Sequence, residues 1–289
     1  MTNLSSPNIR PLKSIRILSL ALNLPGPAAL MRLRLMGARC VKLESPAGDP
    51  MQTYSLPAYT ALHQGIRIST ADLKSDAGQK TLHRELAKAD VLLTSFRPTA
   101  LVKLGLTWKA LHKQYPQLSQ VAIVGSPGAQ AEAPGHDLTY LAENGLVPGL
   151  DLPTTLYADM GGSLMASEAV LQAALHKHTL QKGVYLEVAL SGAASYLALP
   201  RVWGLTTPGA AIGGGHAGYQ IYPCKNGRVV VAALEPHFAA RLCAAAGLDS
   251  VNMRLPATRQ TIATWLLGKT RSQLDKLAVD KDIPLHTLK

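Results

Sequence analysis

The sequence predicts an α/β protein, with a Rossmann-like parallel sheet in a large domain and a smaller α+β domain after it. Two patterns predict this fold class. Residues 15–125 alternate short apolar, β-rich runs with amphipathic helical stretches, which is typical of a parallel sheet covered by helices. A glycine-rich run at 206–218 then precedes two short strands. We therefore expect a large domain over 1–205 and a small domain over 206–289.

The first half of the predicted sheet combines three strands with two helices. The strands are expected at 16–21, 40–44 and 66–71, where short apolar runs occur. A helix at 27–36 begins with Pro27 near its first turn and ends before Gly37, as helix boundaries prefer. A second helix at 75–89 begins with Ser75 as N-cap and Asp76 in its first turn.

The rest of the chain continues the alternation and then loosens. In order, we expect a strand at 90–96, helical structure at 99–114, a strand at 118–124, a loop at 126–135, helices at 137–145 and 160–176, and a strand at 184–190. After the glycine-rich run, strands at 219–222 and 228–233 are joined by a turn at 225–227. The remainder, including 258–267, is predicted to be helical.

Composition excludes several function classes. The net charge of +11 favours an anionic partner, but the 29 Lys and Arg residues are dispersed and only two Phe could stack on bases. We therefore expect no nucleic-acid partner. The three cysteines are far apart, so neither a metal site nor a disulfide framework is predicted. No segment is long and apolar enough for a membrane span, and no leader is recognised, so a cytoplasmic protein without a membrane partner is expected.

The first βα turn does not predict dinucleotide binding. It reads Leu24-Pro25-Gly26-Pro27, with one glycine where the fingerprint has three. Its prolines also lack the N–H groups that would cradle a pyrophosphate. A nicotinamide cofactor is therefore not expected.

Several segments, in order, resemble the family III CoA-transferases. They are 24–28 (LPGPA), 35–44 (LMGARCVKLE), 48–50 (GDP), 71–78 (ADLKSDAG), 89–98 (ADVLLTSFRP) and 104–106 (LGL). Three more are similar to the α-methylacyl-CoA racemase branch of that superfamily, namely 135–141 (GHDLTYL), 158–162 (ADMGG) and 233–238 (ALEPHF). The resemblance implies an interlocked homodimer and an acyl-CoA thioester substrate. Coenzyme A would enter as part of that substrate, with no permanently bound cofactor.

The resemblance also implies roles for individual residues. The catalytic pair maps to His136 and Asp159, and Asp137 and Glu235 occupy positions that support it. The positions that correspond to coenzyme A contacts are Arg97, Asp72, Leu73, Lys74 and Tyr140, with Lys42 and Arg67 as further candidates for its phosphates. Taken singly, each residue has an ordinary interpretation: Asp159 before a helix is an N-cap by default, and Arg97 a surface residue.

The chemistry of a racemase explains why this pair is suitable. Removing and returning a proton beside a thioester needs a base on one face of the α-carbon and an acid on the other. Histidine titrates near neutral pH, whereas Asp159 must be held partly protonated by burial or by a neighbouring negative charge. We expect Asp137 and Glu235 to orient His136. We also expect Asp159 to open a helix, so that the N–H groups of 160–162 face the thioester oxygen.

Two alternatives stay open. A CoA-transferase would use the Asp159 carboxylate as a nucleophile and carry the acyl group as an anhydride. A degenerate paralogue would bind acyl-CoA without turnover. Two observations support this last hypothesis. The sequence departs from the family pattern at Ser45 and Ile66, where basic residues are common, and the loop at 145–159 is shortened. The C-terminal segment that returns to the large domain in the family is also expected to be absent.

Overall fold

The computed structural model describes residues 9–249 and 251–289. Its contacts divide the chain into two compact units, the first ending at Ala198 and the second running from Leu199 to Lys289. The domain boundary expected at 205/206 stays a prediction. Each unit has its own sheet and its own buried core.

The first unit is built on a six-stranded parallel sheet. The strand order is β3-β2-β1-β4-β5-β6, which is the Rossmann order, so the predicted fold class is confirmed. The strands are β1 (Arg16–Ser19), β2 (Arg39–Glu44), β3 (Arg67–Thr70), β4 (Val91–Thr94), β5 (Ser119–Val124) and β6 (Tyr185–Ala189). β1 is central and pairs in parallel with β2 on one side and with β4 on the other. The chain therefore extends the sheet in one direction through β3 and in the other through β6.

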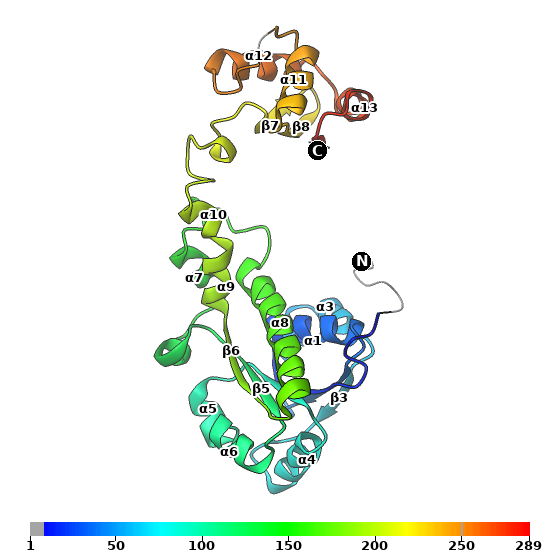
Figure 1. The fold of residues 1–289 in the computed structure, drawn as a ribbon, viewed down its shortest axis with the longest axis vertical. Helices are drawn as coiled ribbons and strands as arrows, with labels where there is room; N and C mark the ends of the chain where they lie inside the picture. The colour runs from blue at the N-terminus through cyan, green and yellow to red at the C-terminus, as the bar shows by residue number, and fades with distance from the viewer. Residues whose placement is uncertain (1–8, 250) are drawn as a thin grey trace. The chain divides into compact units, whose positions relative to one another are not determined.

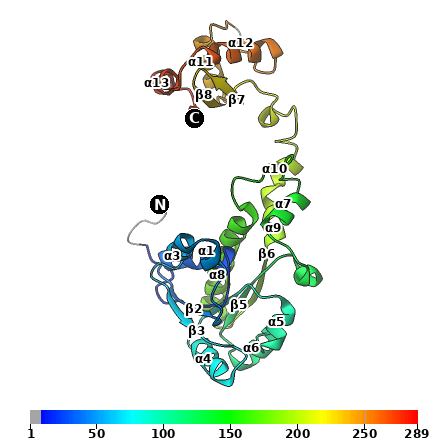
Figure 2. The same cartoon turned by 180° about the vertical axis from the view of Figure 1, so that it is seen from behind.

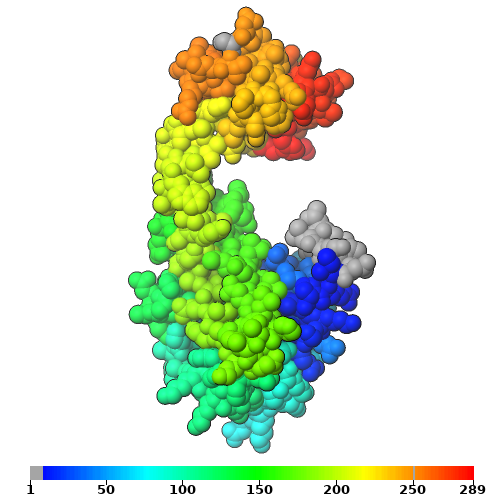
Figure 3. Space-filling model, in the orientation of Figure 1, coloured from blue at the N-terminus to red at the C-terminus, as the bar shows by residue number. Residues whose placement is uncertain are grey.

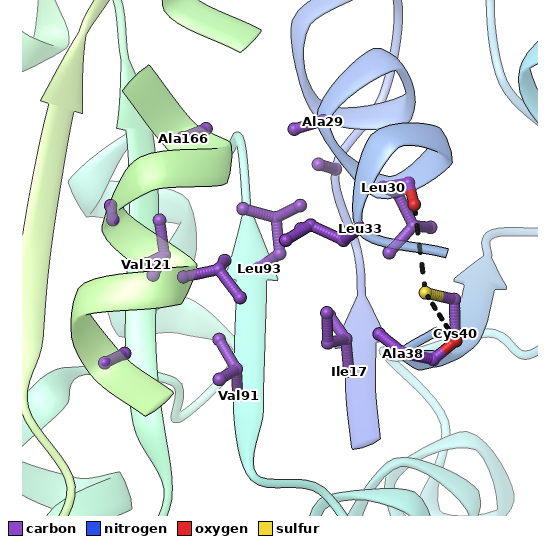
Figure 4. Close-up of a cluster of buried hydrophobic side chains, with 14 of the residues drawn as sticks. Ile17, Ala29, Leu30, Leu33, Ala38, Cys40, Val91, Leu93, Val121 and Ala166 are labelled. Carbon is purple, nitrogen blue, oxygen red and sulfur yellow. Dashed lines mark hydrogen bonds between the residues drawn. The ribbon is translucent and has the colours of Figure 1, made fainter. Parts of the chain in front are cut away.

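Alternate residues of the strands are buried on opposite faces of this sheet. Ile17, Val91 and Leu93 face the helices α1 (Pro25–Leu35) and α8 (Tyr157–Leu180), as Figure 4 shows for α1 and α8 residues such as Leu33 and Ala166. Leu18 and Leu92 face the opposite layer. That layer consists of α4 (Asp76–Leu86), α5 (Pro98–Lys103) and α6 (Trp108–Gln114), and Figures 1 and 2 show it on the other side of the strands. The central strands β4 and β5 are buried at every position, which explains why they are largely apolar.

Helix α8 is the longest element and begins earlier than predicted. It starts at Tyr157 rather than at 160, so Asp159 lies inside the first turn and is not its N-cap. Small residues along α8, including Ala166 and Ala169, let it pack closely against the sheet and α1. The space-filling view shows side chains filling the space between these ribbons on this face (Figure 3).

Several short helices were not predicted. They are α2 (Met51–Tyr54), α3 (Leu56–Leu62), α9 (Leu190–Leu197) and α10 (Leu199–Val202), with 3₁₀ turns η1 (Gly128–Glu132) and η2 (Ala211–Gly213). α7 (Asp137–Glu143) agrees with the helix expected at 137–145. These short segments lack enough turns to show a clear period of 3.6 residues.

The second unit is a three-stranded antiparallel sheet with three helices. The order is β7-β8-β9, from β7 (Tyr219–Cys224), β8 (Gly227–Ala232) and β9 (Leu285–Leu288). The helices α11 (Pro236–Ala245), α12 (Pro256–Leu267) and α13 (Arg271–Lys281) cover its core. The expectation that the remainder is entirely helical is wrong, because β9 pairs with β8, about 60 residues earlier, and short strands are recognised mainly by such partners. Among the described residues, no helix is both long and apolar enough to cross a bilayer.

Candidate active site

A cavity of about 670 Å³ lies at the carboxyl ends of the strands in the first unit. β1 and β4 are neighbours, but the chain leaves them in opposite directions, so the loops that follow them separate and leave a crevice. The lining comes from residues after β1 (Leu22–Pro25), after β4 (Ser95–Arg97) and at the end of β5 (Ile123–Gly125), from the segment at 131–140, and from Met51, Tyr54, Leu156, Asp159 and Leu190. Open α/β sheets place ligands at this topological position.

The structure brings His136 and Asp159 together in the wall of this cavity. His136 precedes α7, and the local geometry there is held by Thr139. The Thr139 hydroxyl accepts a hydrogen bond from the His136 N–H (3.1 Å) and donates one to the His136 carbonyl (2.8 Å). The His136 side chain is exposed, so a ligand entering the cavity can reach its imidazole.

Asp159 is held by a second carboxylate. The backbone N–H of Asp159 donates to Oδ1 of Asp137 at 3.0 Å, and Asp137 is 5% exposed. Burial and the negative charge of Asp137 raise the pKa of Asp159 to about 6, although the nearby His136 acts in the opposite direction. An acid with this pKa exists in both protonation states near neutral pH.

The expected role of Asp137 differs from the one that the contacts show. Its carboxylate contacts the first turn of α8, and in the described parts of the chain no hydrogen bond joins it to His136. Asp137 is thus a positioning residue for Asp159, with a direct effect on its charge. A negative charge at this end of α8 also interacts favourably with the helix dipole.

The N–H groups expected to face a thioester oxygen are used inside α8. The Met160 N–H donates to the Leu156 carbonyl at 3.0 Å, and the next two N–H groups lie where the helix pairs them with the preceding turn. The two glycines have a packing role instead. A Cβ at Gly161 would lie 3.3 Å from Leu197, and one at Gly162 would lie 2.3 Å from Leu190. Both glycines therefore permit the close approach of α8 and α9.

Tyr140 lines the cavity and is almost completely buried, with 4% of its surface exposed. A Cβ on Gly125 would lie 2.3 Å from its hydroxyl oxygen, and one on Gly135 would lie 2.6 Å from its ring. Both positions therefore require glycine next to this phenol. Burial and the negative charge of Asp159 raise the pKa of Tyr140, so it stays a neutral hydrogen-bond donor.

The predicted coenzyme A contacts are divided between two places on the sheet. Arg97 follows β4, is exposed and lies in the cavity wall. Asp72, Leu73 and Lys74 follow β3, outside that wall, and the Asp72 carboxylate accepts the Lys74 N–H at 3.0 Å. Two strands separate β3 from β4, so the two places are roughly 14 Å apart along the carboxyl edge of the sheet. An extended ligand would be needed to contact both.

Lys42 is not available as a phosphate contact. It is completely buried on β2, and its ammonium pairs with Asp49, with Glu44 Oε1 at 3.0 Å and with His63 Nε2 at 2.9 Å. Glu44, Asp49 and His63 form a group with metal-ligand geometry, but the Lys42 ammonium lies among them as the cation. Burial, followed by the charge of Lys42, lowers the pKa of His63. No pattern in the sequence indicates this burial, because a single lysine in a strand resembles any exposed one.

Arg67 is not in this cavity either. It begins β3 at the amino edge of the sheet, and its guanidinium pairs with Glu85 at 2.8 Å. Because parallel strands have their amino ends at one edge and their carboxyl ends at the other, Arg67 and Arg97 belong to opposite edges. The expected phosphate contact by Arg67 within the His136 site is therefore not supported.

Glu235 belongs to the second unit, where it is an exposed residue immediately before α11. Its expected role beside His136 stays a prediction. Sequence reasoning also missed cavity residues with no catalytic chemistry, notably Asn23, Met51 and Tyr54. Asn23 has a left-handed backbone (φ 63°) and donates its N–H to Asp49, which also accepts the Met51 N–H. The signal that was available was the position of Asn23 after a strand end.

Known proteins that act on coenzyme A esters are similar to this chain in sequence. The chain is 35% identical to a cinnamoyl-CoA:phenyllactate CoA-transferase of Clostridium sporogenes over 156 residues, which are 49% of this chain and 38% of that protein. It is 28% identical to the human α-methylacyl-CoA racemase over 257 residues, 83% of this chain and 65% of that protein. The chain thus spans less than two thirds of the length of these relatives.

Solved structures agree on the fold. A CaiB/BaiF family protein from Brucella suis has a TM-score of 0.81 at 23% identity, covering 96% of this chain and 84% of that one. A protein from Mycobacterium tuberculosis has a TM-score of 0.82, also at 23% identity. The model of the family described as CoA-transferase family III matches residues 12–289. The resemblance in the sequence motifs is therefore confirmed, and this chain belongs to CoA-transferase family III.

Proposed function

We propose that this protein binds a 2-methylacyl-CoA thioester in the cavity beside β1 and β4 and moves the proton on its α-carbon. The observation that carries the proposal is the pair formed by His136 and Asp159 in one cavity wall, with the pKa of Asp159 raised to about 6. An acyl-CoA substrate fits the family to which the chain belongs.

The two side chains meet the chemical needs of reversible proton transfer. One removes the α-proton as a base while the other supplies a proton from the opposite face, and the roles exchange for the other enantiomer. With a pKa of about 6, Asp159 is protonated in about one molecule in ten at pH 7, so both of its roles are populated. The imidazole of His136 can accept or donate a proton through a ring nitrogen, so it is chemically suited to both roles.

The enolate-like intermediate needs positive electrostatic potential near the thioester oxygen. The first turn of α8 supplies the positive end of the dipole of a 24-residue helix. Asp137 accepts the N–H of Asp159 in that turn and therefore holds the start of α8 against α7. The Tyr140 hydroxyl and the Arg97 guanidinium, both in the wall, are the further donors that we assign to the thioester and to coenzyme A.

Coenzyme A transfer is a second candidate, favoured by the 35% identity to a CoA-transferase. In that reaction an Asp159 carboxylate oxygen bonds to the thioester carbon and the CoA thiolate leaves, forming an acyl-aspartyl anhydride. The thiolate then attacks the Asp159 carbonyl of this anhydride and releases the first acid, which leaves CoA as a thioester on Asp159. The acceptor carboxylate attacks that thioester to form a new anhydride, and the released thiolate attacks its acyl carbon, giving the new acyl-CoA and the free Asp159 carboxylate. At pH 7 most Asp159 side chains are ionised, as a nucleophile requires.

Deuterium incorporation separates the candidates. The protein is incubated with a 2-methylacyl-CoA in heavy water, with and without a free carboxylic acid, and the α-position is followed by NMR while CoA esters are followed by mass spectrometry. Deuterium at the α-carbon supports proton transfer, and acyl exchange without that label supports CoA transfer. Neither product, together with retained CoA binding, supports a binding protein without turnover.

Variants assign the roles of the two residues. His136→Ala and Asp159→Asn should each reduce deuterium incorporation by at least about a hundredfold, as expected for loss of a general acid or base. His178→Ala and Asp151→Asn are matched controls, because both residues are exposed and lie outside the cavity wall. Full activity of His136→Ala would rule out its role as a base. Loss of acyl exchange in Asp159→Asn, with His136→Ala unaffected, would instead favour CoA transfer.

A further inference from the structure

A second cavity, of about 740 Å³, lies at the amino edge of the same sheet. Three neighbouring strands there begin with arginine: Arg16 begins β1, Arg39 begins β2 and Arg67 begins β3. Arg16 and Arg39 are direct partners in the strand register. Because the cavity of His136 and Asp159 is at the carboxyl ends, the two hollows lie at opposite edges of the sheet.

The lining of this cavity is strongly basic. Six basic side chains line it and only one acidic side chain does; the six are Arg10, Arg16, Arg34, Arg39, Arg67 and Lys88. The acidic one, Glu85, pairs with Arg67 at 2.8 Å. Within residues 9–249 and 251–289, no carboxylate forms an ion pair with the other five cations. The nearby Asp90 carboxylate is occupied by Lys177 and by the backbone N–H of Arg16.

Such a group of cations favours the binding of an anion. Like charges gathered around one hollow repel one another, and an anion between them removes that repulsion. The Nε of Arg34 is buried without a hydrogen-bond partner, so at least one guanidinium here has unused donor capacity. Arginine forks suit the oxygen geometry of phosphates, which accept paired N–H bonds.

We propose that this cavity binds a small molecule with a diphosphate or longer phosphate chain. The volume is within the range of small-molecule sites, and the concave shape suits a compact ligand better than an extended polymer. Two linked phosphates match the spacing of Arg16 and Arg39, which are register partners about 5 Å apart, and Arg67 lies level with Val41, two residues further along β2. The proposal does not depend on the reaction proposed for the other cavity.

Inorganic pyrophosphate is the probe, titrated into the full chain by calorimetry at low ionic strength. The test variant is Arg16→Gln with Arg39→Gln. The matched control is Arg84→Gln with Lys109→Gln, which removes the same charge from exposed positions outside this cavity. We expect the test variant to bind pyrophosphate at least about tenfold more weakly and the control to stay within about twofold of wild type. Unchanged thermal melting of both variants shows that folding is retained.

Three results would overturn the proposal. The first is no pyrophosphate binding by wild type at about 1 mM, and the second is wild-type affinity in the test variant. The third is an equal loss in the test and control variants, which would mean unspecific attraction by net charge.

Coenzyme A also contains a diphosphate, so a competition experiment with coenzyme A is needed to show which of the two cavities binds pyrophosphate. Saturating coenzyme A should leave pyrophosphate binding unchanged, and Arg97→Gln should bind pyrophosphate like wild type. Hydrogen exchange should show pyrophosphate protecting the starts of β1 and β2. Full competition by coenzyme A, with loss of pyrophosphate binding in Arg97→Gln, would place the anion in the first cavity and refute the second site.

Discussion

Asp159 shows how a single residue depends on its neighbours in space. Its carboxyl group is partly buried, and Asp137, 22 positions earlier, adds a negative charge while accepting the Asp159 N–H. Burial and like charge both favour the protonated form, which raises its pKa to about 6. The same aspartate in an exposed first turn would be an ordinary helix-stabilising anion. A functional pKa here therefore results from a contact between α7 and α8.

Asp137→Asn separates the charge of Asp137 from its hydrogen bond. The amide oxygen can still accept the Asp159 N–H, but the negative charge is lost, so the pKa of Asp159 should fall below about 6. The measurement is a pH titration of the carboxyl carbon of Asp159 by NMR, which does not require activity. If Asp159 acts as a base, the acid limb of deuterium exchange should shift to lower pH as well. Asp151→Asn is the control, and an unmoved titration would contradict the assigned cause.

Lys42 provides a second prediction at this scale. Its ammonium is completely buried between Glu44 and Asp49, so Lys42→Met would leave two buried carboxylates without their cation. We expect the free energy of unfolding, measured by denaturant titration, to fall by about 3 to 5 kcal/mol. Lys109→Met, at an exposed position, should change it by less than about 0.5 kcal/mol.

A partial reversal tests the cause of that loss. Adding Asp49→Asn to Lys42→Met removes one of the stranded charges, and the double variant should recover part of the stability. Additive losses in the two variants would show that the ion pair is not what stabilises this region. Because Asp49 also accepts the N–H groups of Asn23 and Met51, both in the cavity wall, weaker substrate binding should accompany Lys42→Met.

At the scale of elements, close packing of α1 and α8 on the sheet decides where the cavity lies. The segment that leads from β1 into α1 carries the cavity residues Leu22–Pro25, so the position of α1 on the sheet determines that wall of the cavity. Gly26 permits this position, since a Cβ there would lie 2.2 Å from the Ala21 Cβ. Neither atom is at the end of a flexible side chain, so the backbone itself must move.

Gly26→Ala should therefore destabilise the protein by about 1 to 3 kcal/mol through overpacking. Gly192→Ala is its matched control in α9, where a Cβ meets nothing closer than 3.6 Å. Because alanine has the higher helix propensity, that control should be neutral or stabilise by up to about 1 kcal/mol. Chemical denaturation of both variants measures the difference. An equal free energy of unfolding for the two variants would mean that the backbone at the start of α1 shifts to accommodate the extra methyl group without loss of stability.

At the scale of the whole molecule, the chain forms two units with separate cores. The second unit buries Val229, Leu242, Ile262 and Leu274 in one cluster around its three-stranded sheet. Its edge strand β9 is supplied by the last residues of the chain. A unit with its own core and sheet meets the structural requirement for folding alone.

The isolated fragment 199–289 should accordingly fold. We expect a cooperative thermal transition by circular dichroism and dispersed amide resonances. A fragment truncated before β9, 199–283, should lose that transition, since β8 would lose one of its two partners. Random-coil spectra for 199–289 would show that the second unit needs the rest of the chain.

The motifs and the alternation of apolar residues were enough to predict the parallel sheet, the family and the pair His136 and Asp159 as neighbours in one site. The sheet follows from local periodicity, whereas the family and the pair were implied by the resemblance of the motifs. The strand at 118–124 was predicted closely because β5 is buried on both faces and ends in an apolar run.

Other features follow only from contacts between distant segments. The sequence did not show that Lys42 is a buried cation, that Asp137 holds Asp159, or that Arg67 lies at the edge opposite Arg97. It also missed β9, whose pairing partner lies about 60 residues earlier. Periodicity reports how a residue sits relative to its own helix or strand. The partner of a charge, and the strength of its field, depend on which elements pack beside it, and only the tertiary structure decides that.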